Sequence, residues 1–288
     1  MNKDYAIEPV KTDKDKIKHP KLSEAGVIPK LGSSILLIGV TKSGKSVLLH
    51  NLLAKKEFYG GVFDKIFTVS PAGDSTLEDL DIPEEQQFND LKKAEKALSA
   101  IHKHQKEQIK KHGPHKAHQF AIVLDDVIGD HSFMKSPEVL MSFIANRHHN
   151  ETVFLCSQHL RSVPKVARLQ ASFVCIFECS SREQDVIAEE YCPAGMTDKQ
   201  FKVMMAEAWS KPYQFLTIHR LWPLKERYRM GLAQPFDIAY FKSLDLSQSG
   251  KKRAREEDEQ SRQNQRLHES STSREREQVG RAVNRGPR

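Results

Sequence analysis

The sequence predicts an α/β domain in which a parallel β-sheet is covered by helices on both faces. Apolar runs of strand length alternate along the chain with amphipathic runs of helix length. Each apolar run is continuous, as in strands that are buried on both faces. A glycine-rich turn joins the first strand to the first helix. With 288 residues, the chain is long enough for one such core and for polar segments at its ends.

The first strand is expected at SSILLIG (33–39) and the first helix at KSVLLHNLLAK (45–55). The helix has four leucines on one face, which suits a helix that packs on a sheet. KIFTVSP (65–71) reads as a second buried strand, stopped by Pro71. A polar, acidic loop is expected to follow at 72–90.

A long amphipathic helix is predicted at 91–111, where apolar residues recur at helical spacing. Five histidines lie in and after it, in the stretch 102–118. They could form a metal tract or a phosphate-contacting surface. A solvated, mildly basic helix and loop is the preferred interpretation. These histidines are His102, His104, His112, His115 and His118.

The second half of the chain continues the alternation of strands and helices. Ser136 is a plausible N-cap with Pro137 at the first helical position, and Ser181 and Thr197 are expected to cap two later helices. The expected strands are 119–130, 152–158, 172–178 and 213–220, and the expected helices are 136–150, 181–191 and 197–210. If the first five strands are numbered in the order in which they occur along the chain, we expect the sheet order 5-1-4-3-2.

The ends of the chain are more polar than its middle. We expect a polar arm at 1–30, a single domain at 31–246 and a disordered tail at 247–288. The net charge is +7, and residues 250–288 carry +4 of it, with eleven Lys/Arg against seven Asp/Glu. The folded part is therefore only weakly basic. KKRAR (251–255) has the density of a nuclear localisation signal, although a solvated charge run explains it equally well.

No run of 18 or more apolar residues occurs, and the N-terminus lacks the apolar stretch of a signal peptide. We therefore expect a soluble intracellular protein that does not insert into membranes. The four cysteines form no C-x-x-C pair, and Cys156 and Cys175 lie inside apolar runs. Buried free thiols are the expected state, in preference to a disulfide or a zinc site.

Residues 39–46 read GVTKSGKS and match the phosphate-binding pattern G-x-x-x-x-G-K-[ST], the Walker A motif, at every fixed position. Its context, a buried strand before and a helix after, is the one that this motif requires. Lys45 is expected to reach the β- and γ-phosphates of ATP, and the Ser46 hydroxyl to ligate Mg²⁺. The expected nucleotide-binding residues are Gly39, Val40, Thr41, Lys42, Ser43, Gly44, Lys45, Ser46 and Val47.

The strand QFAIVLDDVIGD ends in two carboxylates, as a Walker B strand does. Asp125 is expected to hold Mg²⁺, and Asp126 to polarise the water that attacks the γ-phosphate. A buried acid pair without a cation would be costly, which adds to the case for a site. The strand TVFLCSQ ends in Gln158, in the position of a residue that senses the γ-phosphate.

GVTKSGKS, VLDD, NRHHN (146–150) and TVFLCSQHLRSVPKVARLQ (152–170) together resemble the DNA-packaging ATPases of large and mid-sized eukaryotic DNA viruses. These form the poxvirus-type branch of the FtsK–HerA superfamily, which also occurs in virophages and Polinton-like elements. The resemblance spans roughly residues 31–220. It implies a RecA/ASCE-like P-loop NTPase fold. One departure is Asp126, where many wider members of the superfamily carry Glu.

The resemblance implies an ATPase that pumps double-stranded DNA into a preformed capsid as a homo-oligomeric ring. The implied cofactors are ATP and Mg²⁺, and the implied partners are duplex DNA and a capsid or portal-vertex protein. A virion-associated location, or one in the host nucleus or a viral factory, would fit this role.

An arginine finger from the neighbouring subunit is also implied, with Arg147, Arg161 and Arg168 as candidates. Arg147 is favoured because it ends a helix beside the loop edge and matches the family's Arg-His pair; a helix-end arginine placed for the helix dipole is the alternative.

Two other functions remain open from the residues. One is a kinase for nucleosides or other small molecules, although no Arg-rich lid is evident. The other is an assembly switch that uses nucleotide binding for partner choice without motion. A GTPase would need an N-K-x-D sequence, and none is present.

Overall fold

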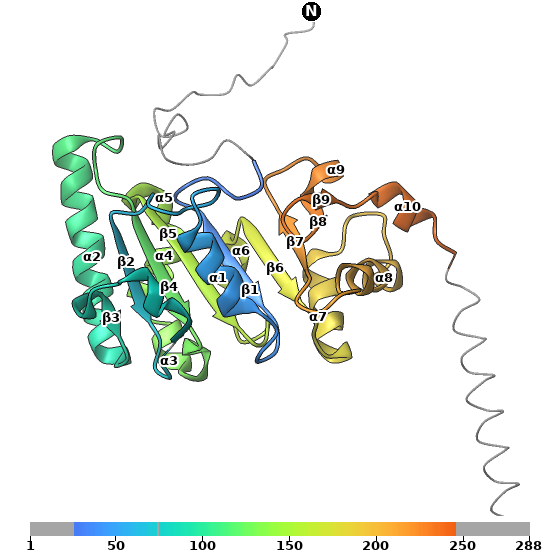
Figure 1. Ribbon diagram of the computed structural model, residues 1–288, viewed down its shortest axis with the longest axis horizontal. Helices are drawn as coiled ribbons and strands as arrows, with labels where there is room; N and C mark the ends of the chain where they lie inside the picture. The colour runs from blue at the N-terminus through green and yellow to red at the C-terminus, as the bar shows by residue number, and fades with distance from the viewer. Residues whose placement is uncertain (1–25, 74, 246–288) are drawn as a thin grey trace, which may run out of the picture. The chain divides into compact units, whose positions relative to one another are not determined.

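The computed structural model describes residues 26–73 and 75–245. Within these ranges, nine strands form one sheet in the order β3-β2-β4-β5-β1-β6-β7-β8-β9 (Figure 1). The strands are β1 Ser34–Ile38, β2 Lys65–Val69, β3 Gln87–Phe88, β4 Phe120–Asp125, β5 Glu151–Ser157, β6 Phe173–Phe177, β7 Phe215–His219, β8 Tyr228–Met230 and β9 Gln234–Pro235. The helices are α1 Lys45–Ala54, α2 Leu91–His112, α3 His131–Met134, α4 Pro137–Ile144, α5 Asn146–His149, α6 Lys165–Gln170, α7 Ser181–Tyr191, α8 Asp198–Ala208, α9 Leu224–Arg227 and α10 Ile238–Ser243, with 3₁₀ turns η2 Ser75–Leu80, η3 Glu84–Gln86 and η4 Val127–Gly129.

The parallel part of the sheet runs from β3 to β6 and confirms the predicted strand order. The expected order 5-1-4-3-2 corresponds to β6-β1-β5-β4-β2, and every neighbouring pair among these strands is parallel. Leu37 of β1 lies opposite Cys156 of β5, and Cys156 lies opposite Asp125 of β4. The carboxyl ends of these three strands therefore meet at one edge of the sheet.

The other edge is antiparallel, and the predicted order of five strands did not include it. β7, β8 and β9 each run opposite to the preceding strand. The connection from β6 to β7 contains two helices, α7 and α8, which pack against each other. This connection starts and ends at the carboxyl edge, because Phe177, the last residue of β6, pairs with Phe215, the first residue of β7.

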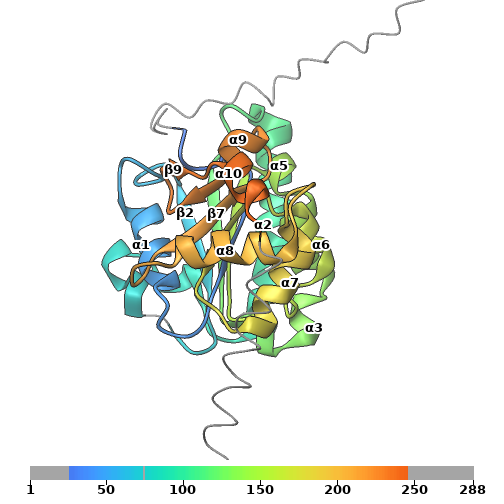
Figure 2. The same ribbon diagram turned by 90° about the vertical axis from the view of Figure 1, so that its right-hand side faces the viewer.

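Helices cover both faces of the sheet, as predicted. Figure 2 shows α1 on one side and α3, α6 and α7 on the other. Leu49, Leu52 and Leu53 of α1 are buried in a cluster with residues of β1 and β5. The core also takes in residues just before the first strand, because Ile28 is buried and the Tyr59 hydroxyl donates a hydrogen bond to the Pro29 carbonyl oxygen at 2.6 Å.

The helix predicted at 136–150 is two helices, α4 and α5, separated by Ala145, whose φ of −110° and ψ of 4° are not helical. Asn146 explains the break. Its side-chain amide donates to the Ser34 hydroxyl of β1 at 2.8 Å, and its carbonyl oxygen accepts from the Arg147 backbone N–H at 2.7 Å. A side chain that competes for backbone groups and is tied to the sheet interrupts a helix.

The predicted caps Ser136 and Thr197 are confirmed, because each side chain accepts a hydrogen bond from a backbone N–H of its helix. The prediction of Ser181 is wrong by one residue, since Ser180 caps α7. The acidic segment 72–90 is also more ordered than predicted, with η2, η3 and β3 within it. These elements have two to six residues, too few to show a period in the sequence.

The interpretation of the histidine stretch as solvated is wrong for its first member. His102 is buried, whereas His104, His112, His115 and His118 are exposed. The four cysteines are free thiols, and Cys156 and Cys175 are buried as expected.

The compact unit of the chain ends at Phe241, and residues 242–288 form a separate unit. The predicted tail at 247–288, the KKRAR segment and most of the predicted arm, up to residue 25, lie outside the described residues.

Candidate active site

The loop between β1 and α1 has the backbone of a phosphate cradle. Lys42 and Gly44 both have positive φ, 63° and 106°, so the chain curls tightly before α1 begins at Lys45. Gly39 has no room for a side chain, because a Cβ there would lie 2.6 Å from Cβ of Phe177 and 2.8 Å from Oγ of Ser43. Both glycines of the motif are therefore required by the geometry of the loop.

The Lys45 ammonium is turned into this loop. It donates hydrogen bonds to the carbonyl oxygens of Gly39 at 2.7 Å and of Val40 at 2.9 Å. Burial lowers the pKa of Lys45, and the negative charges of Asp125 and Asp126 oppose that effect. The ammonium thus stands at the mouth of the cradle, where phosphate oxygens are better partners than carbonyl groups for a charged donor.

Most of the other loop residues are exposed to solvent. Thr41 and Lys42 are exposed, and Ser46 is half-buried in the first turn of α1. The side chains of Val40 and Val47 are also exposed, at 46% and 58%. The first turn of α1 contains no acidic residue, so its free N–H groups can attract an anion.

The acid pair lies at the same edge of the sheet. Asp125 is the last residue of β4, and Asp126 follows in the left-handed conformation with a φ of 51°. Asp125 is half-buried and Asp126 is exposed, so the expectation of a buried pair is wrong. Because both acids reach solvent, the free-energy cost of burying two charges does not require a bound cation. Both carboxylates remain accessible beside Lys45.

Gln158 joins the acids to the loop. Its side-chain amide donates to Oδ1 of Asp126 at 3.3 Å. The residue before it, Ser157, accepts a hydrogen bond from the Gly39 N–H through its carbonyl oxygen at 3.0 Å. The strand that carries Gln158 is thus bonded to the first residue of the cradle and to the second acid.

The three candidate arginines lie in different places. Arg147 is in α5. Its Cα would lie 3.0 Å from a Cβ added to Gly32, the residue two positions before β1. Arg147 is therefore at the amino edge of the sheet, and the expectation that it lies beside the loop edge is wrong. Arg161 follows Gln158 on the carboxyl side, where its side chain is 72% exposed and 3.9 Å from Glu189. Arg168 is bonded to Glu190 and to the Val163 carbonyl oxygen.

Two aromatic residues that the sequence analysis missed lie against the loop. A Cβ on Gly44 would be 3.3 Å from Cε1 of Phe177 and 3.4 Å from Cδ1 of Tyr213. Tyr213 is 73% exposed and has a φ of 64°, which is rare for an aromatic residue. An exposed ring held in a strained conformation beside a phosphate loop is able to stack on a nucleobase. No local motif marks Tyr213 in the sequence.

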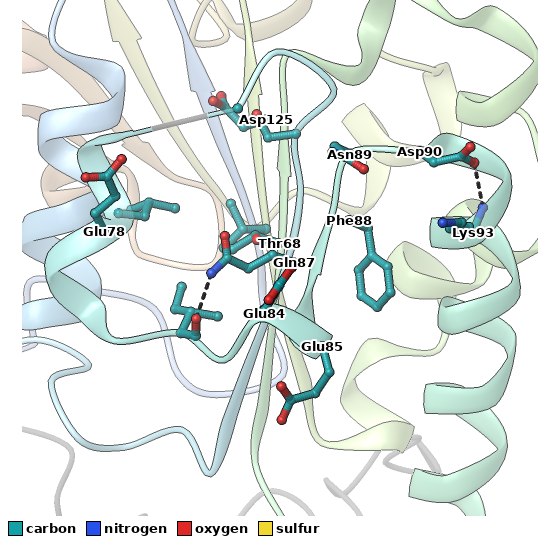
Figure 3. Close-up of a pocket in the computed structure, with 15 residues that line it drawn as sticks. Thr68, Glu78, Glu84, Glu85, Gln87, Phe88, Asn89, Asp90, Lys93 and Asp125 are labelled. Carbon is teal, nitrogen blue, oxygen red and sulfur yellow. Dashed lines mark hydrogen bonds between the residues drawn. The ribbon is translucent and has the colours of Figure 1, made fainter.

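An acidic hollow of about 540 Å³ adjoins the site. Asp125 lines it, but no residue of the loop 39–47 does (Figure 3). Its charged lining residues are five carboxylates and one cation, Lys93, so the net charge of the wall disfavours phosphates. The carboxylates are those of Glu78, Glu84, Glu85, Asp90 and Asp125.

Residues 30–219 match the family of the poxvirus A32 protein. No curated protein matches the chain.

In the part of the chain that the structure describes, no helix has the length and apolar character needed to cross a membrane.

Many solved structures are similar to this chain, including the following three. The genome packaging NTPase B204 from Sulfolobus turreted icosahedral virus 2, in complex with AMPPCP, is 17% identical over 65% of this chain and 92% of its own, with a TM-score of 0.47. EssC (ATPases 2 and 3) from Geobacillus thermodenitrificans is 12% identical over 65% of this chain and 38% of its own, with a TM-score of 0.48. The pCW3 conjugation coupling protein TcpA is 14% identical over 65% of this chain and 57% of its own, with a TM-score of 0.44.

The family match covers about two thirds of the chain, including the phosphate loop, the acid pair and Gln158. This chain belongs to the family of the poxvirus A32 protein.

Proposed function

We propose that this protein hydrolyses ATP and uses the energy to move double-stranded DNA into a viral capsid. The observation that carries the ATPase part is the meeting of three groups at one sheet edge. The Lys45 ammonium, the Asp125–Asp126 pair and the Gln158 amide come from three different elements and share this edge. An ATP-driven motor needs a loop that holds the phosphates and an acid that orients the attacking water. It also needs a contact that links this site to a neighbouring strand.

The roles follow from the positions of the groups. Lys45 exchanges its bonds to the Gly39 and Val40 carbonyl oxygens for bonds to the β- and γ-phosphates. Asp126 is the more exposed acid and accepts a proton from the attacking water or orients that water. Gln158 is bonded to Asp126, so a change at the γ-phosphate alters this contact and is passed to β5.

The residues also fit a Mg²⁺ ion. Ser46 offers a hydroxyl in the first turn of α1, and Asp125 offers a carboxylate at the end of β4, which is the hard oxygen donor set that this ion prefers. When bound, Mg²⁺ neutralises charge on the β- and γ-phosphates. Tyr213 is proposed to stack on the adenine ring.

The DNA part of the proposal rests on membership of the poxvirus A32 family and on the resemblance of the motifs to DNA-packaging ATPases. We propose a homo-oligomeric ring around duplex DNA, docked on a capsid or portal-vertex protein. Arg147 is proposed as the finger that completes the site of a neighbouring subunit. Its position at the amino edge supports action in trans, because its own cradle lies at the opposite edge.

The rate of ATP hydrolysis, measured with and without duplex DNA at one stated salt concentration, tests the proposal. A DNA-driven motor releases phosphate faster when duplex DNA is present. A small-molecule kinase would instead transfer the phosphoryl group to an acceptor and ignore DNA. An assembly switch would bind ATP with little turnover under either condition.

A further inference from the structure

A cluster of two imidazoles and one carboxylate lies at the amino edge of the sheet, away from the nucleotide site; His102 and Glu151 are buried, and His149 is half-buried. His102 comes from α2, His149 from the end of α5 and Glu151 from the first position of β5. One nitrogen or oxygen atom of each side chain lies within 4.8 Å of the others. The Glu151 side chain carries a carboxyl group and is 0% exposed, in a strand that is buried along its whole length.

Two polar atoms of this cluster have no hydrogen-bond partner among the described residues. They are Nδ1 of His149 and Oε2 of Glu151, and both are inaccessible to solvent. They face each other at 3.9 Å, which is too long for a hydrogen bond. Buried polar atoms without partners are rare, and each one calls for an explanation such as a bound ion or water.

The His102–Glu151 pair does not provide this explanation. Nδ1 of His102 is 3.0 Å from Oε1 of Glu151, so this contact uses only one of the two carboxylate oxygens. It leaves Oε2 of Glu151 and Nδ1 of His149 without a hydrogen-bond partner within the described residues.

The second nitrogen of His102 is held as in a metal-binding histidine. Nε2 lies 3.0 Å from the Glu138 carbonyl oxygen and 3.2 Å from the Ser142 hydroxyl. A carbonyl oxygen only accepts, so Nε2 carries a hydrogen. A metal ion bound by Nδ1 would take the place of the proton that Nδ1 shares with Oε1 of Glu151. A ring N–H fixed on a backbone carbonyl group is the usual outer partner of a histidine ligand.

We propose that His102, His149 and Glu151 bind one divalent transition-metal ion of the Zn²⁺ class. Two imidazoles with one carboxylate are a known donor set for this ion, with bonds of roughly 2.0–2.2 Å and tetrahedral geometry. Such bonds place neighbouring donor atoms about 3.3 Å apart. In the structure, Nδ1 of His102 is 3.0 Å from Oε1 of Glu151, Nδ1 of His149 is 3.9 Å from Oε2, and one donor atom of each residue lies within 4.8 Å of the others, so binding requires the side chains to draw together. Water fills the fourth position. The ion fastens α2 and α5 to the start of β5.

The site is tested on the untagged full-length chain, stripped with EDTA and kept in excess Mg²⁺ so that the nucleotide site does not take up the probe. Zn²⁺ is titrated by calorimetry and its effect on thermal unfolding is recorded. His149→Gln removes one ligand, and His148→Gln, at the exposed neighbouring residue, is the matched control. Co²⁺ serves as a second probe because its visible absorption reports tetrahedral coordination.

We expect one Zn²⁺ per chain for the wild type and for His148→Gln, with a rise in Tm of about 5–10 °C at a hundredfold excess over Kd. His149→Gln should lose both the stoichiometric binding and the rise. The proposal is overturned if His149→Gln binds Zn²⁺ as the wild type does, or if Zn²⁺ leaves the Tm of the wild type unchanged, as a water-filled or proton-sharing cluster would. Should His149→Gln fail to fold, the Co²⁺ spectrum of the wild type decides, and the absence of a tetrahedral absorption overturns the site.

Discussion

Replacing Gly39 by alanine tests the geometry of the phosphate cradle. The added Cβ would lie 2.6 Å from Cβ of Phe177, whereas carbon atoms in contact are normally separated by about 3.5–4.0 Å. Cβ of Phe177 is fixed to the backbone of the buried strand β6 and cannot swing away. The loop must therefore move by about 1 Å to remove the overlap.

This movement has two measurable results. Forcing an extra methyl group into a packed site costs about 1–3 kcal/mol, which lowers the Tm of a domain of this size by about 2–12 °C. Moving the cradle by about 1 Å also misplaces the phosphates, for which a loss on the order of 10²-fold in ATP turnover is expected. Thermal unfolding and phosphate release measure the two effects separately.

Gly129→Ala is the matched control. Gly129 also lies near the site, three residues after Asp126, but a Cβ there meets nothing within 4 Å. We expect wild-type stability and turnover for this variant. If Gly39→Ala had the same Tm and the same turnover as the wild type, the tight packing of the loop against β6 would be wrong.

Three further predictions concern single residues. Lys45→Ala should weaken ATP binding and abolish turnover, whereas Asp126→Asn should bind ATP and not hydrolyse it; full turnover by Asp126→Asn would mean that the acid strand is misassigned. Arg147→Ala should lose on the order of 10³ in turnover with little change in ATP affinity, and mixing it with Lys45→Ala should restore part of the rate, because mixed rings contain complete sites. Mixed rings that assemble without any rescue would exclude Arg147 as the finger. Burial lowers the pKa of His219 to about 4, so the unfolded chain binds more protons than the folded chain between about pH 6.5 and 4. Stability should therefore fall as the pH drops through this window, and His219→Gln should show a shallower fall in Tm; a parallel pH profile would contradict this assignment.

The parallel core was predictable because its strands are continuous apolar runs and its helices have clear periods. The antiparallel edge was not predictable, because the direction of β7 depends on the sheet edge at which the chain re-enters after α7 and α8. β8 and β9 are also only three and two residues long, which is too short for a pattern. The break between α4 and α5 depends on the contact from Asn146 to Ser34, two residues that are far apart in sequence.

The cradle, the acid pair and Gln158 were predictable because each is a short motif at the end of a strand. The position of Arg147 was not, since helix order alone does not tell which sheet edge a helix end faces. Tyr213 reaches the loop only through the reversal of the chain before β7. Glu151 reads as the polar start of a strand, and only the fold brings it to His102 and His149.

The central claim is that ATP hydrolysis by this protein moves it along duplex DNA. Displacement of a third strand from a duplex that carries a short triplex measures such movement directly, without depending on the rate of ATP turnover. The proposed function predicts displacement by the wild-type protein with ATP, and none with Asp126→Asn or with a non-hydrolysable ATP analogue. ATP turnover that duplex DNA stimulates without any displacement of the third strand would contradict the claim.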